Sequence, residues 1–309
     1  MTTDQPIRRP RLADSPDDVR AVIQDLLGSA IVAEHPARAG FTPSAASVVV
    51  GSKGNRLFVK AAPVGEGLGE AVEAGVALAQ VADELGPLLV GSATVKEWRV
   101  AAYEVVEGEP VKWWEAADHP RLLEVLQRMR EVMDPCPVAG TSSYAEAFLP
   151  MLGTWQALNN NAGPASIGRP LPVDLPVPLL AEMESRWLDV LGGGSALHHG
   201  DLRRDNVIRE RTGRLRIVDW THLWTAPGWM DLIRLAPDVA ACGHDPERLL
   251  QRSCWRDAPA DEVNVALAGL AGRGWRDGHL PDIPGLPGLR RMQREQCLHT
   301  LRWLEARLA

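Results

Sequence analysis

The strongest constraint on the fold is a change in hydrophobic patterning after the first third of the chain. In the first third, short runs rich in Val and Ala alternate with turns of Gly, Ser and Asn, which is typical of antiparallel strands. One stretch there, residues 70–85, instead has apolar residues at helical spacing. After Glu107-Gly108-Glu109-Pro110 the spacing becomes helical almost throughout. The sequence therefore predicts an α+β protein with a small antiparallel β lobe that carries one long helix, residues 1–107, followed by a larger helical lobe, residues 108–309.

The expected elements follow from local signals. Ser15 can cap a helix, Pro16 suits its first position, and Asp17 and Asp18 complement the positive end of its dipole, so a helix is predicted at residues 15–27. Strands are predicted at residues 46–50, 56–61, 90–94 and 99–106, and further helices at 120–133, 144–152, 179–191 and 290–308.

Composition excludes several classes of protein. The chain has 309 residues, of which 45% are hydrophobic and 24% charged, so it is not a disordered chain. No uncharged apolar run approaches the roughly 18 residues of a membrane helix, and the N-terminal residues lack the apolar region of a signal peptide. The net charge of −7 disfavours nucleic acid as a partner. The four cysteines are far apart, and we expect reduced thiols in a cytoplasmic protein.

Three polar side chains in one later segment suit a particular chemistry. Asp201 and Asn206 lie five residues apart on a predicted loop, and Asp219 ends the apolar strand Arg216-Ile217-Val218. Phosphoryl transfer from a nucleotide needs a carboxylate that accepts or orients the proton of an attacking hydroxyl. It also needs hard oxygen ligands for Mg²⁺, and carboxylate and amide oxygens provide these. The segment is therefore a candidate phosphotransfer site.

The motif His199-Gly200-Asp201-Leu202, three further residues and Asn206, followed by Ile217-Val218-Asp219-Trp220, resembles the catalytic signature of aminoglycoside phosphotransferases. That family shares the protein-kinase-like fold, in which Asp219-Trp220-Thr221 would stand where protein kinases have D-F-G. The resemblance implies that Asp201 is the catalytic base and that Asn206 and Asp219 bind Mg²⁺. It also implies ATP as phosphate donor, with GTP left open. Asp231 resembles the family's acid that braces the catalytic loop.

The β lobe carries further residues that match the family. Lys60, one of only four lysines, ends an apolar strand and resembles the lysine that binds the α- and β-phosphates. An acid on the following helix should pair with this lysine. Glu73 and Glu70 are both candidates one helical turn apart, and we prefer Glu73.

Two loops and one arginine complete the predicted site. Ser44 belongs to a hydroxyl-bearing turn, residues 40–45, that replaces the glycine-rich loop of protein kinases and could cradle phosphate. Glu104 and Val106 lie in a segment that resembles the hinge whose backbone amides bind the adenine edge. Arg203 follows Asp201 by two residues and could bind the transferred phosphate, although a surface arginine is an equal alternative.

The acceptor is left open by the sequence. There is no A-P-E segment, which favours a hydroxyl of a small molecule, an antibiotic or a metabolite, over a protein. From Asp231 to the C-terminus there are eleven acidic and eleven basic residues, so the acidic bias expected for a polycationic aminoglycoside is missing. Two alternatives remain: a Ser/Thr kinase that modifies a precursor peptide in lanthipeptide-type biosynthesis, and a nucleotide-binding pseudokinase that regulates a partner.

Overall fold

The computed structural model describes residues 9–37, 44–65, 67–160, 169–284, 286 and 288–309. The chain divides into two compact units. The first comprises Met1–Val111 and Asp205–Leu223, and the second comprises Lys112–Arg204 and Trp224–Ala309. The sequence placed a single division between residues 107 and 108, whereas in the structure the chain returns to the first unit at residues 205–223.

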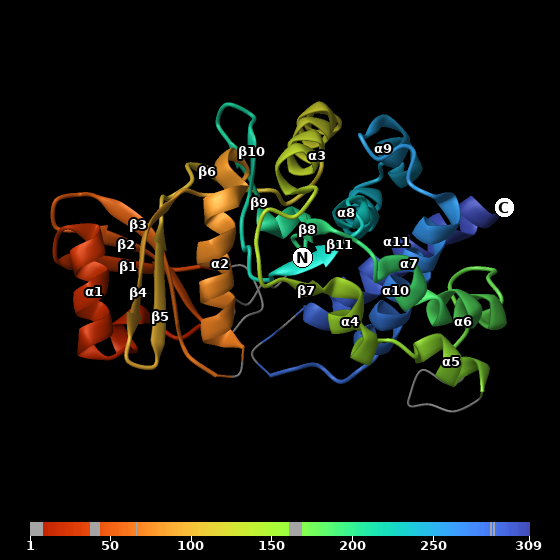
Figure 1. The fold of residues 1–309 in the computed structure, drawn as a ribbon, viewed down its shortest axis with the longest axis horizontal. Helices are drawn as coiled ribbons and strands as arrows, with labels where there is room; N and C mark the ends of the chain where they lie inside the picture. The colour runs from red at the N-terminus through yellow and green to blue at the C-terminus, as the bar shows by residue number, and fades with distance from the viewer. Residues whose placement is uncertain (1–8, 38–43, 66, 161–168, 285, 287) are drawn as a thin grey trace. The chain divides into compact units, whose positions relative to one another are not determined.

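A five-stranded antiparallel sheet forms most of the first unit. Its order is β1-β2-β3-β5-β4, and Figure 1 shows helices α1 and α2 on either side of it. The strands are β1 (Ile31–Pro36), β2 (Ala45–Gly51), β3 (Arg56–Pro63), β4 (Leu89–Val95) and β5 (Trp98–Tyr103), and the helices are α1 (Asp17–Leu27) and α2 (Leu68–Ala82).

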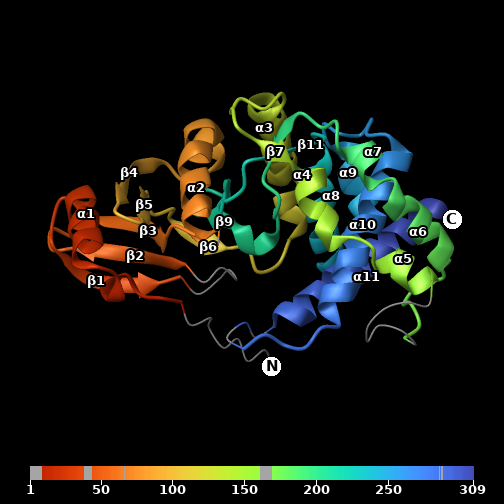
Figure 2. The ribbon, with the colours of Figure 1, turned by 60° about the horizontal axis from the view of Figure 1, so that its bottom comes forward.

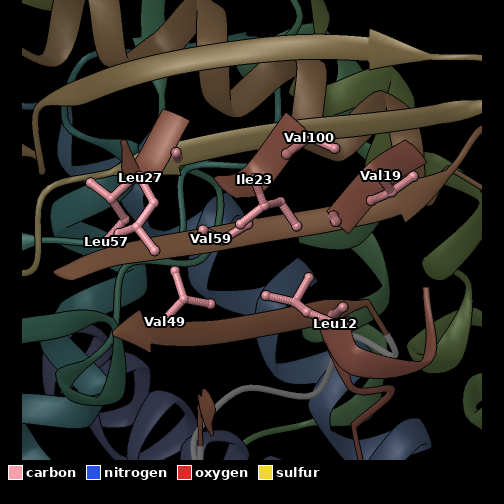
Figure 3. Packing of buried hydrophobic residues seen from close by; sticks show 11 residues of the cluster. Leu12, Val19, Ile23, Leu27, Val49, Leu57, Val59 and Val100 are labelled. Carbon is pink, nitrogen blue, oxygen red and sulfur yellow. The ribbon is translucent and has the colours of Figure 1, made fainter. Parts of the chain in front are cut away.

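Strand alternation divides the buried side chains between the two faces of this sheet. One face packs against α1, where the side chains of Ile23, Val49 and Val59 are fully buried (Figure 3). The other face packs against α2 in a smaller cluster that contains Val72 and Tyr103. Because successive residues of a strand point to opposite faces, burial of Val59 under α1 turns its neighbour in β3 toward α2. Burial of each aliphatic side chain contributes about 1.5–3 kcal/mol.

A small second sheet draws the residues after 204 into the first unit. Its order is β10-β9-β6, with β6 (Gly108–Pro110), β9 (Val207–Glu210) and β10 (Leu215–Ile217). A Cβ at Gly108 would lie 2.4 Å from the carbonyl oxygen of Arg209, so the close approach of β6 to β9 requires glycine there. This sheet is the physical reason that the segment ending in Asp219 groups with the first unit.

The second unit is mainly helical. Its helices are α3 (His119–Met133), α4 (Tyr144–Phe148), α5 (Thr154–Asn159), α6 (Val177–Ser185), α7 (Trp187–Leu191), α8 (Met230–Ala241), α9 (Pro246–Arg252), α10 (Ala260–Gly278) and α11 (Leu289–Leu308). A three-stranded sheet has the order β7-β11-β8, with β7 (Ser142–Ser143), β8 (Ala196–His198) and β11 (Trp224–Ala226). The two long helices α10 and α11 pack side by side (Figure 2).

The predicted α+β class is confirmed, with an antiparallel sheet in the first unit and a mainly helical second unit. The details differ in two places near the N-terminus. Ser15 does not cap α1, because its hydroxyl donates to the carbonyl oxygen of Leu12 and the helix begins at Asp17. Strand β1 was not predicted, since its side chains are only partly buried and lack the alternation that marks a strand. The four cysteines are free thiols, and no helix among the described residues is long and apolar enough to cross a membrane.

Candidate active site

A cavity of about 470 Å³ lies within the first unit. Its walls come from β2, β3, α2, the segment after β5 and residues 205–221, and most of the lining is apolar. Three polar residues singled out by the sequence, Lys60, Asn206 and Asp219, line this one cavity. A largely apolar pocket with a few convergent polar groups is the usual form of a small-molecule site.

Lys60 and Asp219 form an ion pair in the wall of the cavity. Lys60 points toward α2 because Val59 and Ala61, its neighbours in β3, are fully buried in the cluster under α1. Asp219 has a φ of 66°, in the left-handed region that Asp tolerates better than most residues. This backbone turn at the end of an apolar strand directs the carboxylate to the amine.

Asn206 lies beside the strand that carries Asp219. Its carbonyl oxygen accepts a hydrogen bond from the amide of Val218 at 2.8 Å, and its side chain is buried. The amide of Asn206 and the carboxylate of Asp219 therefore line the cavity from adjacent backbone segments. No group of three or more His, Cys, Asp and Glu residues in the described ranges could hold a metal by itself. One amide and one carboxylate fit Mg²⁺, which is usually bound by one or two protein ligands together with water and substrate phosphate.

The expected pair between Lys60 and an acid of α2 is corrected by the structure. Glu73 is exposed and forms an ion pair with Arg99 of β5, and Glu70 is exposed as well. The face of α2 that lines the cavity is built from small and apolar residues, among them Ala71, Gly75 and Ala79. Glu70 and Glu73 are one turn apart and share one face of α2. That face is opposite to the one that lines the cavity. Residue type alone suggested these two acids, whereas the phase of α2 decides which residues face the cavity.

Gly75 explains why this face of α2 carries no long side chain. A Cβ at Gly75 would lie 2.9 Å from the carbonyl oxygen of Trp220 and 2.9 Å from the hydroxyl of Tyr103. The helix backbone therefore packs directly against the residue that follows Asp219. Burial and the charge of Asp219 both raise the pKa of Tyr103, so its hydroxyl stays neutral in this wall of the cavity.

Glu104 has a different role from the one expected of a hinge residue. Its amide donates to the carbonyl oxygen of Leu88 at 2.9 Å, so this amide is already engaged. Its carboxylate accepts from the amide of Leu88 at 3.1 Å and from Arg216 at 2.6 Å. Glu104 thus braces the segment after β5, and both Glu104 and Val106 line the cavity.

Arg216 is a residue that the sequence analysis did not single out. It lies in β10, its side chain is 10% exposed, and its guanidinium donates to Gly86, Glu104 and Glu210. These three partners belong to the segment before β4, the segment after β5 and strand β9. Arg216 therefore joins the segment after β5 to the β9–β10 hairpin that precedes Asp219. A charged residue inside an otherwise apolar strand was the signal that could have indicated it.

Ser44 lines the cavity, and its carbonyl oxygen accepts a hydrogen bond from Nη1 of Arg9 at 3.2 Å. Residues 40–43 of the expected phosphate-binding turn lie outside the described residues. Arg9 itself lines the cavity and was not predicted. Burial lowers the pKa of Arg9 and the charge of Asp219 opposes that shift, so the two side chains interact electrostatically.

The loop after β8 in the second unit holds Asp201 between two arginines. Arg203 donates from Nη1 to both carboxylate oxygens of Asp201, at 2.7 and 2.8 Å. Arg234 of α8 donates to Oδ1 of Asp201 at 2.9 Å and to the hydroxyl of Tyr144 at 3.3 Å. These charge-assisted bonds keep the carboxylate ionised and fix its direction. Arg234 was missed, although it lies three residues after Asp231 and so on the same helix face.

Asp231 anchors this loop from α8. It is buried, forms a 2.9 Å contact with Nδ1 of His198, and accepts hydrogen bonds from the amides of His199 and Gly200 at 2.8 and 3.2 Å. Burial alone would raise the pKa of Asp231, but the charge and hydrogen bond of His198 together with the amide of His199 lower it. Gly200 has a φ of 81°, which permits the turn into Asp201.

Comparisons with known proteins show the family of the chain and confirm its protein-kinase-like fold. A family model described as "Phosphotransferase enzyme family" matches residues 35–279. The fold is similar to that of choline kinase LicA from Streptococcus pneumoniae, with 13% identity and a TM-score of 0.55 over 93% of this chain and 98% of that one.

Two aminoglycoside phosphotransferases give similar values. One, APH(4)-Ia in a ternary complex with ADP and hygromycin B, has 13% identity and a TM-score of 0.55 over 94% of this chain and 98% of that one. The other, from Alicyclobacillus acidocaldarius, has 14% identity and a TM-score of 0.55 over 90% and 92%. At such identities these likenesses concern the fold. No curated protein matches the chain by sequence.

Proposed function

This chain belongs to the phosphotransferase enzyme family and is a kinase that acts on hydroxyl groups, and from that premise we propose that it transfers the terminal phosphoryl group of Mg²⁺·ATP to a small molecule. The observation that carries the proposal is the ion pair of Lys60 and Asp219 in a cavity that Asn206 also lines. A cation for phosphate oxygens and two oxygen ligands for Mg²⁺ are the parts that nucleotide chemistry requires.

Lys60, Asn206 and Asp219 each have a role in this proposal. Lys60 donates hydrogen bonds to the α- and β-phosphates of the nucleotide. Phosphate oxygens then replace Asp219 as the partner of its amine. Asn206 and Asp219 hold Mg²⁺, which when bound neutralises charge on the phosphates. The apolar walls exclude water, and this strengthens each of the electrostatic contacts. The backbone at Val106 faces the same cavity and is the candidate contact for the base.

Asp201 is the proposed group that receives the proton of the acceptor hydroxyl. Arg203 and Arg234 hold both of its oxygens, so it is ionised and fixed in orientation. Such a carboxylate is a weak base, which suits a reaction whose loose transition state depends mainly on positioning and charge stabilisation. In this role Arg203 positions Asp201, and direct binding of the transferred phosphate is the alternative that the sequence left open.

The proposal is tested by turnover and by an acceptor screen. Wild-type protein with Mg²⁺ should hydrolyse ATP slowly without acceptor, and mass spectrometry should detect phosphate on one member of a panel of aminoglycosides, other alcohols, sugars and Ser/Thr peptides. ATP and GTP are offered in parallel. Asp219→Ala should abolish both activities, whereas Arg99→Gln, which removes an ion pair at the exposed edge of α2, should keep them.

Two other outcomes of these assays would favour the alternative functions. Wild-type protein that binds ATP with Mg²⁺ yet neither hydrolyses it nor modifies any acceptor would contradict the proposal and favour a nucleotide-binding regulator. Phosphate found only on the peptides would favour the precursor-peptide kinase.

A further inference from the structure

We propose that Arg9 binds the phosphate groups of the nucleotide and thereby completes a cavity whose sequence has no glycine-rich loop. The inference rests on the proposed function, because it takes a nucleotide to be the ligand of the cavity. Arg9 lies outside the residues that the family model matches, 35–279, so the family comparison assigns it no role.

The position of Arg9 is the first argument. Its side chain lines the same cavity as Lys60 and Asp219. Its Nη1 donates to the carbonyl oxygen of Ser44 at 3.2 Å, a contact between residues 35 apart in the chain. Ser44 directly precedes β2, where the phosphate-binding turn was expected. Arg9 therefore lies at the part of the cavity that the sequence assigns to phosphate.

The residues that follow Arg9 are attached to the sheet of the first unit. Leu12 is 2% exposed and belongs to the hydrophobic cluster under α1. The amides of Leu12 and Ala13 donate to the carboxylate of Glu34 in β1, at 2.8 and 3.1 Å. Only two residues, Pro10 and Arg11, separate Arg9 from Leu12. The fold thus holds the guanidinium near the cavity, which lowers the entropic cost of binding a ligand there.

The charges of the lining also favour a phosphate ligand for Arg9. The charged residues of the cavity wall are Arg9, Lys60, Glu104, Asp205 and Asp219, of which Glu104 is paired with Arg216, and Lys60 with Asp219. A nucleoside triphosphate carries several negative charges, which Lys60 and one bound Mg²⁺ neutralise only in part. Arg9 adds a second cation, and a planar guanidinium can donate two parallel hydrogen bonds to one phosphate.

The test compares variants of two neighbouring arginines. Arg9→Gln removes the cation in the cavity. Arg11→Gln is the matched control, because Arg11 is 58% exposed and contacts Glu34 at 3.8 Å. Calorimetry with the full chain and Mg²⁺ measures the Kd of ATP, ADP and adenosine. We expect Arg9→Gln to weaken ATP binding about 10- to 100-fold, the effect of one charge-assisted contact, and to leave adenosine binding unchanged.

Three further results decide the proposal. Arg9→Lys should restore part of the ATP affinity, since an ammonium provides charge without the bidentate geometry. Equal loss for ATP and adenosine would overturn the proposal, because it would indicate a general disturbance of the cavity. Unchanged or tighter ATP binding in Arg9→Gln would also overturn it, and tighter binding would identify Arg9 as a blocking group beside Asp219.

The inference and the proposed function fail in different ways. If wild-type protein binds no ATP, the proposed function is wrong and the inference falls with it. If wild-type protein binds ATP and Arg9→Gln binds it equally well, the inference alone is wrong and the kinase remains.

Discussion

Replacement of Arg216 by methionine should destabilise the first unit and weaken nucleotide binding together. The side chain of Arg216 is 10% exposed, and its carboxylate partners Glu104 and Glu210 are 34% and 21% exposed. Methionine is of similar length and keeps the packing of the aliphatic stem, so the change isolates the loss of the guanidinium.

The magnitude follows from the contacts that are lost. Arg216 donates to the carbonyl oxygen of Gly86 at 3.1 Å and to the two carboxylates at 2.6 and 3.3 Å. Removal of one member of a buried ion pair costs about 3–5 kcal/mol. Because water can reach Glu104 and Glu210 in part, we expect a loss of about 2–4 kcal/mol in the free energy of unfolding.

Urea unfolding followed by tryptophan fluorescence measures this loss as a lower midpoint with an unchanged slope. Arg214→Met is the control, because Arg214 is 43% exposed, its partner Glu84 is 69% exposed, and such surface pairs contribute about 0–1 kcal/mol. The Kd of ATP should rise in the Arg216 variant, since Glu104 no longer braces the hinge. Equal stability of the two variants, together with equal ATP affinity, would show that Arg216 does not hold these segments together.

Three further changes test other parts of the molecule. Asp201→Asn should retain nucleotide binding and lose about 10²–10⁴-fold in rate, and an unchanged rate would remove Asp201 from the mechanism. Gly75→Ala gains about 1 kcal/mol in helix propensity but costs about 1–3 kcal/mol in overpacking against Trp220, so urea unfolding should show a net loss of about 0–2 kcal/mol and calorimetry weaker ATP binding. Burial raises the pKa of Glu184, opposed in part by backbone hydrogen bonds at the start of α5. The folded protein therefore keeps this proton at pH values where the unfolded chain has lost it, and stability falls as pH rises from the ordinary value of 4.5 through the raised pKa. Glu184→Gln should flatten that slope in urea unfolding between about pH 4 and 8, and an identical slope would contradict the assignment.

The fold class and the candidate phosphotransfer segment could both be predicted from the amino-acid sequence. Both depend on information that is local along the chain: the period of apolar residues distinguishes strands from helices, and Asp201, Asn206 and Asp219 lie within nineteen consecutive positions. The face of the sheet on which Lys60 lies could also be predicted, because successive side chains of a strand point to opposite faces.

Which distant side chains meet depends on how whole elements pack against one another. The phase of α2 against the sheet turns Glu73 to Arg99 and leaves Gly75 at the cavity, and residue type could not reveal that phase. Arg9 and Arg216 join segments that are 35 and more than 100 residues apart. Such contacts depend on where whole elements pack, because packing is set by shape and burial summed over many residues and leaves no local pattern in the sequence.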